Sequence, residues 1–301
     1  MAARFSSPAA SLFASRPAIH ASFEWLGHLA VWVGLYVGGC VVMSGLLLHG
    51  RVSLMALFIA IPTTMGTYLV DRVGPWSGRS DPADRMAHPD RVSMLLKFDS
   101  GVRLAAVVCI LSAAVATMFF QPMAVVAVLG APIGVWIYSH RGRLPRPKDS
   151  MVVKNLFVAI SITLLVLLLD GHGSRPSSLI AVGIFLLLNI FADAMLCDID
   201  DSAADARFGT RTIANTLGSA KTWRLAILLQ SMAFFVTIIA AADGLMAWFP
   251  VLLMGFTSLS LTFLIRSLRV RRVKDLVDLK LPMAVSIVWI LISMTGRGLL
   301  A

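Results

Sequence analysis

Residues 178–197 read SLIAVGIFLLLNIFADAMLC, an almost wholly apolar run that leads directly into the acidic stretch DIDDSAAD at residues 198–205. A helix needs about 20 mostly apolar residues to cross a membrane, and the run has that length. Ionisable side chains within a membrane or at its edge are costly, so they are candidates for function by default. The stretch therefore predicts a membrane-spanning helix that ends in a functional site.

Eight further runs of similar length and composition occur along the chain. Hydrophobic residues make up 58% of the 301 residues and charged residues only 14%, whereas an average soluble domain has about 25% charged residues. This composition excludes a soluble enzyme, a disordered chain and a disulfide scaffold. We expect an all-α polytopic membrane protein, a bundle of nine transmembrane helices in one domain over residues 27–301, after a cytoplasmic tail over residues 1–26. The nine spans are expected at residues 27–48, 52–71, 102–120, 122–139, 153–170, 178–197, 222–242, 244–265 and 281–299.

The basic residues fall mainly on one side of this arrangement. The opposite side carries only Arg51, Arg175 and Arg297. Because cytoplasmic segments carry an excess of lysine and arginine, we expect the N-terminus in the cytoplasm and the C-terminus outside. The arginine clusters lie in the connecting segments at residues 72–101, 140–152, 198–221 and 266–280.

The net charge of +10 does not indicate a nucleic-acid partner, because the basic residues form short clusters between apolar runs and match no nucleic-acid-binding motif. The same clusters suit anionic lipid headgroups. The N-terminal stretch MAARFSSPAASLFASRPAIHASF has the composition of an organellar transit peptide, although a tail lying on the membrane is the favoured interpretation. We expect a bacterial inner membrane with the active site facing the cytoplasm, and an organellar membrane is the alternative.

Three of the aspartates that close the sixth span share one helix face. At about 100° per residue, Asp201 lies about 60° and Asp205 about 20° from Asp198, whereas Asp200 and Asp193 are expected to point away. Like charges on one helix face repel, so the arrangement calls for a cation. Oxygen-only ligands favour Mg²⁺ over zinc. The alternative is a solvated acidic helix end.

A second acidic position closes the second span. Asp71 is the only acid within that helix end, and Asp81 and Asp84 follow in the next connecting segment. These later acids are either further ligands or ordinary loop charges.

A basic segment joins the fourth and fifth spans and leads to Lys154 at the mouth of the fifth span. Its cations include Arg141 and Lys148. Lys154 either extends to the lipid headgroups or forms part of an anion clamp over the aspartates. Carboxylates, Mg²⁺ and cations at one membrane face indicate a diphosphate site, and an isoprenoid tail would suit the apolar helices.

With these motifs, the chain resembles the UbiA superfamily of intramembrane prenyltransferases, which are nine-helix bundles with aspartate-rich motifs after the second and sixth helices. The Lys154-Asn155 helix start after a basic linker is similar too. The first family motif, NDxxDxxxD, aligns with Thr67, Tyr68, Asp71 and Pro75, so only its central acid is present. The second family motif, DxxDxxxD followed by GxxT and a run ending in Leu-Gly, aligns with Asp198, Asp201, Asp205, Gly209, Thr212 and Leu217-Gly218.

The resemblance implies Mg²⁺-dependent transfer of a prenyl group from an isoprenoid diphosphate to a lipophilic acceptor within the membrane. It implies catalytic roles for Asp71, Asp198, Asp201 and Lys154, and Mg²⁺ ligation by Asp71, Asp198, Asp201 and Asp205. The diphosphate would contact Arg72, Arg141, Lys148, Lys154 and Arg211, with Tyr68 and Tyr138 as aromatic neighbours of the allylic cation.

Two other functions stay open from the sequence. A terpene cyclase of the same superfamily would use a double bond of the isoprenoid itself as the nucleophile. A transporter would use the aspartates as a cation site, but such proteins tend to have inverted repeats and broken helices near the membrane centre. The identity of the acceptor, the prenyl chain length and the oligomeric state cannot be read from the sequence.

Overall fold

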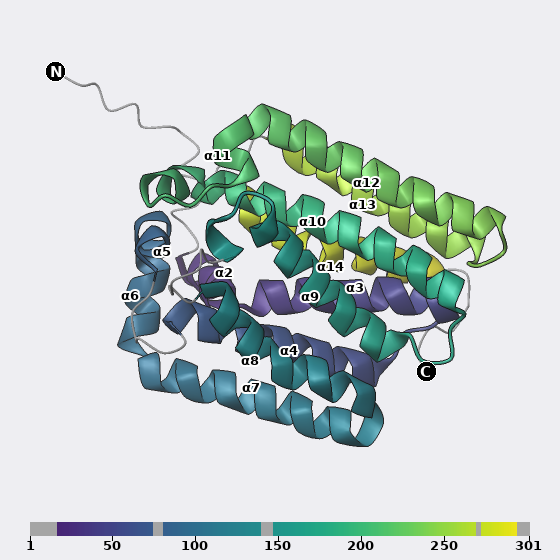
Figure 1. Ribbon diagram of the computed structural model, residues 1–301, viewed down its shortest axis with the longest axis horizontal. Helices are drawn as coiled ribbons and strands as arrows, with labels where there is room; N and C mark the ends of the chain where they lie inside the picture. Colours follow the sequence, from purple (N-terminus) through teal and green to yellow (C-terminus); the bar gives the residue numbers. More distant parts are fainter. Residues whose placement is uncertain (1–16, 75–80, 140–146, 269–271, 294–301) are drawn as a thin grey trace.

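The computed structural model describes residues 17–74, 81–139, 147–268 and 272–293, and every regular element within these ranges is a helix. The long helices lie roughly side by side in one bundle (Figure 1). Eight helical segments are long and apolar enough to cross a membrane: α3 (Val31–His49), α4 (Leu54–Val73), α7 (Asp99–Phe120), α8 (Val125–Ser139) with its preceding turn η1 (Pro122–Ala124), α9 (Val153–Asp170), α10 (Pro176–Arg207), α12 (Ser219–Ala242) and α13 (Trp248–Leu268).

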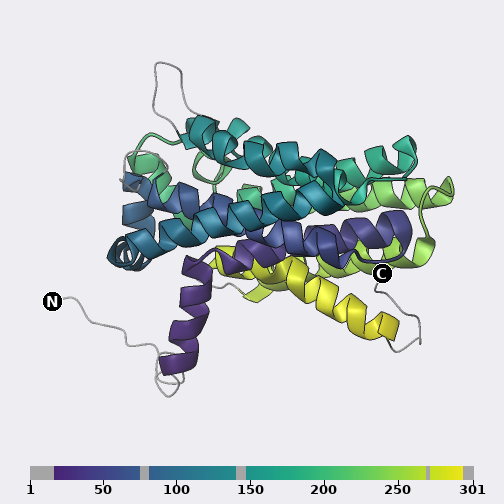
Figure 2. The ribbon, with the colours of Figure 1, turned by 90° about the horizontal axis from the view of Figure 1, so that it is seen from below.

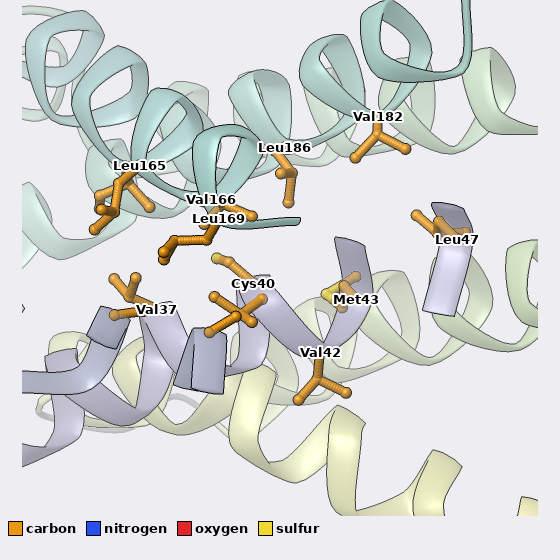
Figure 3. Packing of buried hydrophobic residues seen from close by; sticks show 14 of the residues in the cluster. Val37, Cys40, Val42, Met43, Leu47, Leu165, Val166, Leu169, Val182 and Leu186 are labelled. Carbon is orange, nitrogen blue, oxygen red and sulfur yellow. The ribbon is translucent and has the colours of Figure 1, made fainter. Parts of the chain in front are cut away.

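Helix α3 lies at the centre of the bundle and packs against α4, α9, α10 and α14 (Val273–Ser293). Figure 3 shows Val37 and Cys40 of this helix facing apolar side chains of α9 and α10, whereas Val42 points to the opposite side. Its glycines allow close approach, since a Cβ on Gly39 would lie 2.8 Å from the Leu281 Cβ of α14. Small residues at such contacts are how membrane helices pack closely.

The outer helices expose large apolar side chains, as expected of surfaces that face lipid. On α7, for example, Leu104 is 64% exposed and Phe119 78% exposed. Solvent contact would make such a surface unfavourable, whereas lipid chains match its chemistry. The chain is therefore an integral membrane protein.

Short helices gather at one end of the bundle (Figure 1). The starts of α5 (Pro82–Ala87) and α6 (Pro89–Lys97) are each set by a proline in the first turn, where its missing N–H costs nothing. The helix α11 (Ile213–Leu217) and the turn η2 (Pro147–Asp149) complete this end. Together they surround the charged ends of α4, α9 and α10.

The polytopic all-α architecture expected from the sequence is confirmed, whereas the count of nine spans stays a prediction. Helix α14 begins eight residues before the expected span 281–299 and carries Lys274, Asp275, Asp278 and Lys280 in its first half, so it is not among the eight. Residues 294–301 lie outside the described ranges.

The expected first span at residues 27–48 begins too early. Helix α2 (Pro17–His28) overlaps its first two residues, and Ala30 has a φ of 61°, which separates α2 from α3, so the first long apolar helix begins at Val31. Figure 2 shows α2 turned away from the bundle. It covers part of the segment predicted as a tail, and residues 1–16 lie outside the described ranges.

Much of the sequence expected as loops is helical. Helix α10 continues ten residues past the expected end of its span, to Arg207, so the acidic stretch stays in register with the membrane helix. Residues 82–97 form α5 and α6, and residues 273–280 form the first turns of α14. Charged residues interrupt the apolar pattern in these segments, so they were not predicted as helices. Packing against neighbouring helices keeps them helical.

Candidate active site

Two adjoining cavities lie at the charged end of the bundle. The first, here the polar cavity, has a volume of about 160 Å³ and is walled by α3, α4, α9, α10 and α14 with contributions from the short helices. The second, here the apolar cavity, has a volume of about 300 Å³ and lies between α4, α8 and α9. Both are lined by Tyr68, Asp71, Tyr138, Val158 and Ile162, which therefore form the junction.

The aspartates of α10 line the polar cavity and are bound by α9. The Lys154 Nζ lies 2.8 Å from Asp198 Oδ1 and 3.1 Å from Asp205 Oδ2. Asn155 donates from Nδ2 to the other oxygen of Asp198 at 3.0 Å. The Lys154-Asn155 start of α9 thus holds the first and last acids of the triad in one place.

The middle acid of the triad has different partners. Asp201 accepts a hydrogen bond from the His88 ring at 2.7 Å, and the Lys274 Nζ of α14 lies 3.2 Å from its other oxygen. Burial lowers the pKa of His88 below its ordinary value, so the imidazole is neutral at neutral pH. Asp200 points away from the cavity, as expected, and accepts from the Lys274 backbone N–H at 2.8 Å.

A cluster of opposite charges forms the rim of the polar cavity. Lys148 of η2 is 7% exposed, and its Nζ lies 3.4 Å from Asp81 and 3.6 Å from Asp84. Arg91 of α6 lies 3.7 Å from Asp84. Burial by itself would lower the pKa of Lys148, but the carboxylates of Asp71 and Asp84 outweigh it and raise that pKa above its ordinary value.

Asp71 and two tyrosines mark the junction between the cavities. Asp71 Oδ1 accepts a hydrogen bond from the Ser139 hydroxyl at 2.6 Å. Tyr138 stacks on Phe157 of α9 with ring centroids 5.5 Å apart. Tyr68 and Tyr138 therefore present aromatic surface where the charged and apolar regions meet.

The apolar cavity is lined by threonines whose hydroxyls are already used. Thr63, Thr64 and Thr67 each donate to a carbonyl of their own helix four residues back, at 2.7–2.8 Å. On its outer edge, Ser161 and Leu164 of α9 line the cavity and are exposed on the lipid-facing surface. The cavity is thus apolar in character and opens sideways toward the bilayer.

The segment after the triad serves the turn that follows α10. Gly209 has a φ of +80°, a value that favours glycine. Thr212 caps α11, accepting from the Asn215 N–H while the Asn215 side chain accepts from the Thr212 N–H. The GxxT part of the motif therefore has a structural role in this fold.

Of the other predicted diphosphate contacts, Arg72 and Arg211 lie within the described residues. Arg72 lines the polar cavity, but its Nη1 donates to the carbonyls of Gly27 and His28 at 2.7 and 2.8 Å, at the end of α2. Arg211 is exposed and lines neither cavity. Arg141 lies outside the described residues.

The structure adds residues that the sequence analysis missed. His88, Arg91 and Lys274 contact the predicted acids from segments that were expected as loops. Asp193 was expected to point away, but it lines the polar cavity too. Helices α9 and α14 both pack against α10 and both line this cavity, so more than one face of α10 contributes to its wall. The charges of α14 at a spacing of three or four residues were the signal available for Lys274.

The donor chemistry of the polar cavity fits Mg²⁺. Asp71, Asp198, Asp201 and Asp205 all line it and offer only oxygen. Within the described ranges, however, no three histidine, cysteine or acidic side chains lie close enough to share one ion as placed. Lys154, Lys274 and His88 bind these carboxylates instead, so a divalent cation would compete with side-chain donors.

The fold and the site define a class: an intramembrane helical protein that holds a cluster of acids and cations beside an apolar chamber. The profile of the UbiA prenyltransferase family matches residues 82–287. The chain therefore belongs to the UbiA prenyltransferase family. No curated protein sequence matches it significantly.

Solved structures share the fold at low sequence identity. A UbiA homologue from Archaeoglobus fulgidus is 15% identical, with a TM-score of 0.57 over 90% of this chain and 97% of that chain. The same homologue bound to GPP and Mg²⁺ gives a TM-score of 0.60 at 15% identity, over 90% of this chain and 99% of that chain. A digeranylgeranylglyceryl phosphate synthase is 13% identical, with a TM-score of 0.51 over 89% and 93% of the two chains.

Proposed function

We propose that this protein transfers a prenyl group from an isoprenoid diphosphate to a lipophilic acceptor within the membrane. The observation that carries the proposal is the junction at Tyr68, Asp71 and Tyr138, where a charged cavity meets an apolar one. An allylic diphosphate has the same division, with a strongly charged head on an apolar tail. The family membership and the fold shared with a homologue bound to GPP and Mg²⁺ support this function.

The acids of the polar cavity serve the charged head. Asp71, Asp198, Asp201 and Asp205 would hold Mg²⁺, which supplies positive charge to the diphosphate as its bond to carbon breaks. Lys148, Lys154, Arg91 and Lys274 surround the same cavity and stabilise the leaving group. Lys154 would compete with Mg²⁺ for Asp198 and Asp205. Once displaced from these carboxylates, the ammonium group of Lys154 would be available to bind the phosphate.

The remaining groups protect the reactive carbon. The C1–O bond breaks with its electron pair leaving on the diphosphate; the acceptor atom then bonds to C1 and releases a proton to the diphosphate. The faces of Tyr68 and Tyr138 stabilise the allylic cation at the junction. The apolar walls hold the tail and exclude water from the cation until the acceptor attacks.

The cytoplasmic orientation is part of the proposal, and the arginine pattern of the connecting segments supports it. The active site would face the cytoplasm of a bacterial inner membrane. Thiol labelling of Arg85→Cys and Arg175→Cys variants in sealed vesicles tests this, because only the first should react from the cytoplasmic side. Labelling of Arg175→Cys alone from that side would reverse the orientation.

Diphosphate release tests the function directly. The full chain, reconstituted in bilayers with Mg²⁺ and geranyl, farnesyl or geranylgeranyl diphosphate, should release diphosphate and form a prenylated lipid when lipid extract is added. Asp201→Asn should slow release by about a hundredfold, since one charged contact to the reacting group is lost. Asp200→Asn is the matched control, because Asp200 lies on the same helix but outside both cavities.

The products separate the alternatives. A cyclic hydrocarbon or alcohol formed without extract would show that the protein is a terpene cyclase and not a transferase. Absence of binding and release with all three diphosphates would contradict the proposal, and equal rates for Asp201→Asn and wild type would contradict the site.

A further inference from the structure

A second polar cluster lies deeper in the bundle than the Lys154 contacts. Asp193 of α10 forms an ion pair with Lys280 of α14 at 2.6 Å and accepts hydrogen bonds from Tyr36 of α3 and Gln230 of α12, each at 2.8 Å. Asp193 is 2% exposed and Lys280 is fully buried. A buried charge pair in a membrane protein is costly, so its retention points to a function.

Only part of this cluster reaches the polar cavity. Tyr36 and Asp193 line it, whereas Gln230 and Lys280 stand behind them and line neither cavity. Lys280 neutralises the charge of Asp193, so this wall has no net charge to attract a diphosphate. It differs in this from the wall that carries Lys148 and Lys154.

The hydrogen bonds of the cluster fix what Tyr36 can offer to a ligand. A tyrosine hydroxyl has one proton, and Tyr36 donates it to Asp193 Oδ2. The hydroxyl oxygen therefore has only lone pairs left, and it can bind an O–H or N–H donor but not a phosphate oxygen. Asp193, with three donors around it, holds Tyr36 in this state.

We propose that Tyr36, oriented by Asp193, binds the prenyl acceptor by accepting a hydrogen bond from a hydroxyl group on it. The proposal rests on the proposed prenyl transfer and adds the chemical class of the acceptor, an alcohol or a phenol. The diphosphate occupies the cationic wall, and the acceptor hydroxyl occupies the neutral wall of the same cavity. Tyr36 is a binding residue in this assignment, and Asp193 is a positioning residue.

The acceptor dependence of two variants tests the assignment. Tyr36→Phe keeps the ring but removes the hydroxyl, and Gln230→Met also removes one donor to Asp193, from behind the cavity. In bilayers with farnesyl diphosphate and increasing lipid extract, Tyr36→Phe should need about tenfold more extract for half-maximal transfer, the effect of one lost hydrogen bond. Gln230→Met should stay within about twofold of wild type. Diphosphate release without extract should be the same in Gln230→Met and wild-type protein, because Gln230 lines neither cavity.

Extract whose hydroxyl groups have been methylated provides the second arm. Wild-type protein should form no prenylated product from it. Equal product from methylated and native extract, or an unchanged extract requirement for Tyr36→Phe, would overturn the assignment and leave prenyl transfer standing. Equal effects in Tyr36→Phe and Gln230→Met would overturn it as well, because the role would then be structural. Absence of transfer by wild-type protein overturns both proposals.

Discussion

Lys154 bridges two carboxylates that are proposed as metal ligands. Its ammonium group lies between Asp198 and Asp205, at 2.8 and 3.1 Å. Replacing it by a neutral residue leaves two carboxylates with less compensation, and this raises their attraction for any other cation. In the proposed reaction, the same replacement would also remove a charge that stabilises the leaving diphosphate.

We therefore expect Lys154→Gln to change two properties in opposite directions. Mn²⁺ binding in the absence of isoprenoid diphosphate should tighten by about tenfold, measured by electron paramagnetic resonance titration. Prenyl transfer should fall by about a hundredfold. Lys148→Gln should tighten Mn²⁺ binding in the absence of isoprenoid diphosphate less than Lys154→Gln does, because Lys148 forms its ion pairs with Asp81 and Asp84 and not with Asp198 and Asp205. Weaker Mn²⁺ binding by Lys154→Gln would show that Lys154 supports the metal site.

The Asp84 carboxylate gives a pH-dependent contribution to stability. Burial opposes its charge, but the neighbouring Lys148 and Arg91 outweigh burial and hold its pKa below the ordinary value. A carboxyl group whose pKa is lower in the folded than in the unfolded protein stabilises the fold at pH values above its ordinary pKa. That stabilisation is lost as pH falls through the folded pKa.

Thermal unfolding of Asp84→Asn in detergent checks this. The variant should melt below wild type at about pH 6, and the two melting temperatures should converge as the pH falls below the ordinary carboxyl range and Asp84 becomes protonated. A difference that does not depend on pH would show that Asp84 acts through packing alone.

At the residue scale, sequence periodicity was enough to place the three acids of α10 in one cavity. The partners of Asp201 could not be predicted in the same way, because His88 and Lys274 lie more than 70 residues away from it in the chain. Pairing across such separations is set by helix packing, which a single sequence does not encode locally. The helix-capping role of Arg72 at α2 escaped for the same reason.

At the scale of single helices, α8 sets the shape of the apolar cavity. Small residues on it, including Gly130 and Gly134, line the chamber. A Cβ at Gly130 would meet no atom within 4 Å, so a larger side chain there has free space to enter. The length of the tail that fits should depend on this space.

Gly130→Leu should shorten the accepted prenyl chain. The ratio of transfer rates for geranylgeranyl over geranyl diphosphate should fall by about tenfold, the value of one or two displaced methylene contacts. Gly101→Leu is the control, because Gly101 of α7 is equally open but lines neither cavity. An unchanged ratio for Gly130→Leu would place the tail elsewhere.

Apolar runs predicted the long helices well, since length and hydropathy decide whether a segment can span a membrane. The connecting segments were less readable. Helices α5 and α6 and the first turns of α14 carry many charges, and what holds them is contact with α10 and α4. These are the segments that supply Arg91, His88 and Lys274.

At the scale of the molecule, α3 joins the two sides of the bundle. Its Gly39 lies against Leu281 of α14, where an added Cβ would lie 2.8 Å from a side-chain carbon and 3.2 Å from backbone. Gly39→Ala should therefore destabilise the protein by about 1–3 kcal/mol through overpacking. Gly101→Ala should stabilise it slightly, since alanine favours the helix and has room.

Chemical denaturation of both variants in detergent measures the change in the free energy of unfolding, which should be negative for Gly39→Ala and slightly positive for Gly101→Ala. A gain in stability for Gly39→Ala would show that α14 is not seated against α3 as described. The cluster around Tyr36 depends on the same contact between α14 and α3. Lys280 of α14, which pairs with Asp193, directly precedes Leu281.

The sideways opening of the apolar cavity at Ser161 and Leu164 has a kinetic consequence. A tail that enters from the bilayer arrives by two-dimensional diffusion, so the rate is set by the mole fraction of isoprenoid among the lipids. Adding inert phospholipid at a fixed total amount of substrate should slow the enzyme, although the bulk concentration is unchanged. The membrane around this protein would then hold the supply of substrate, and the lipid composition would control the rate.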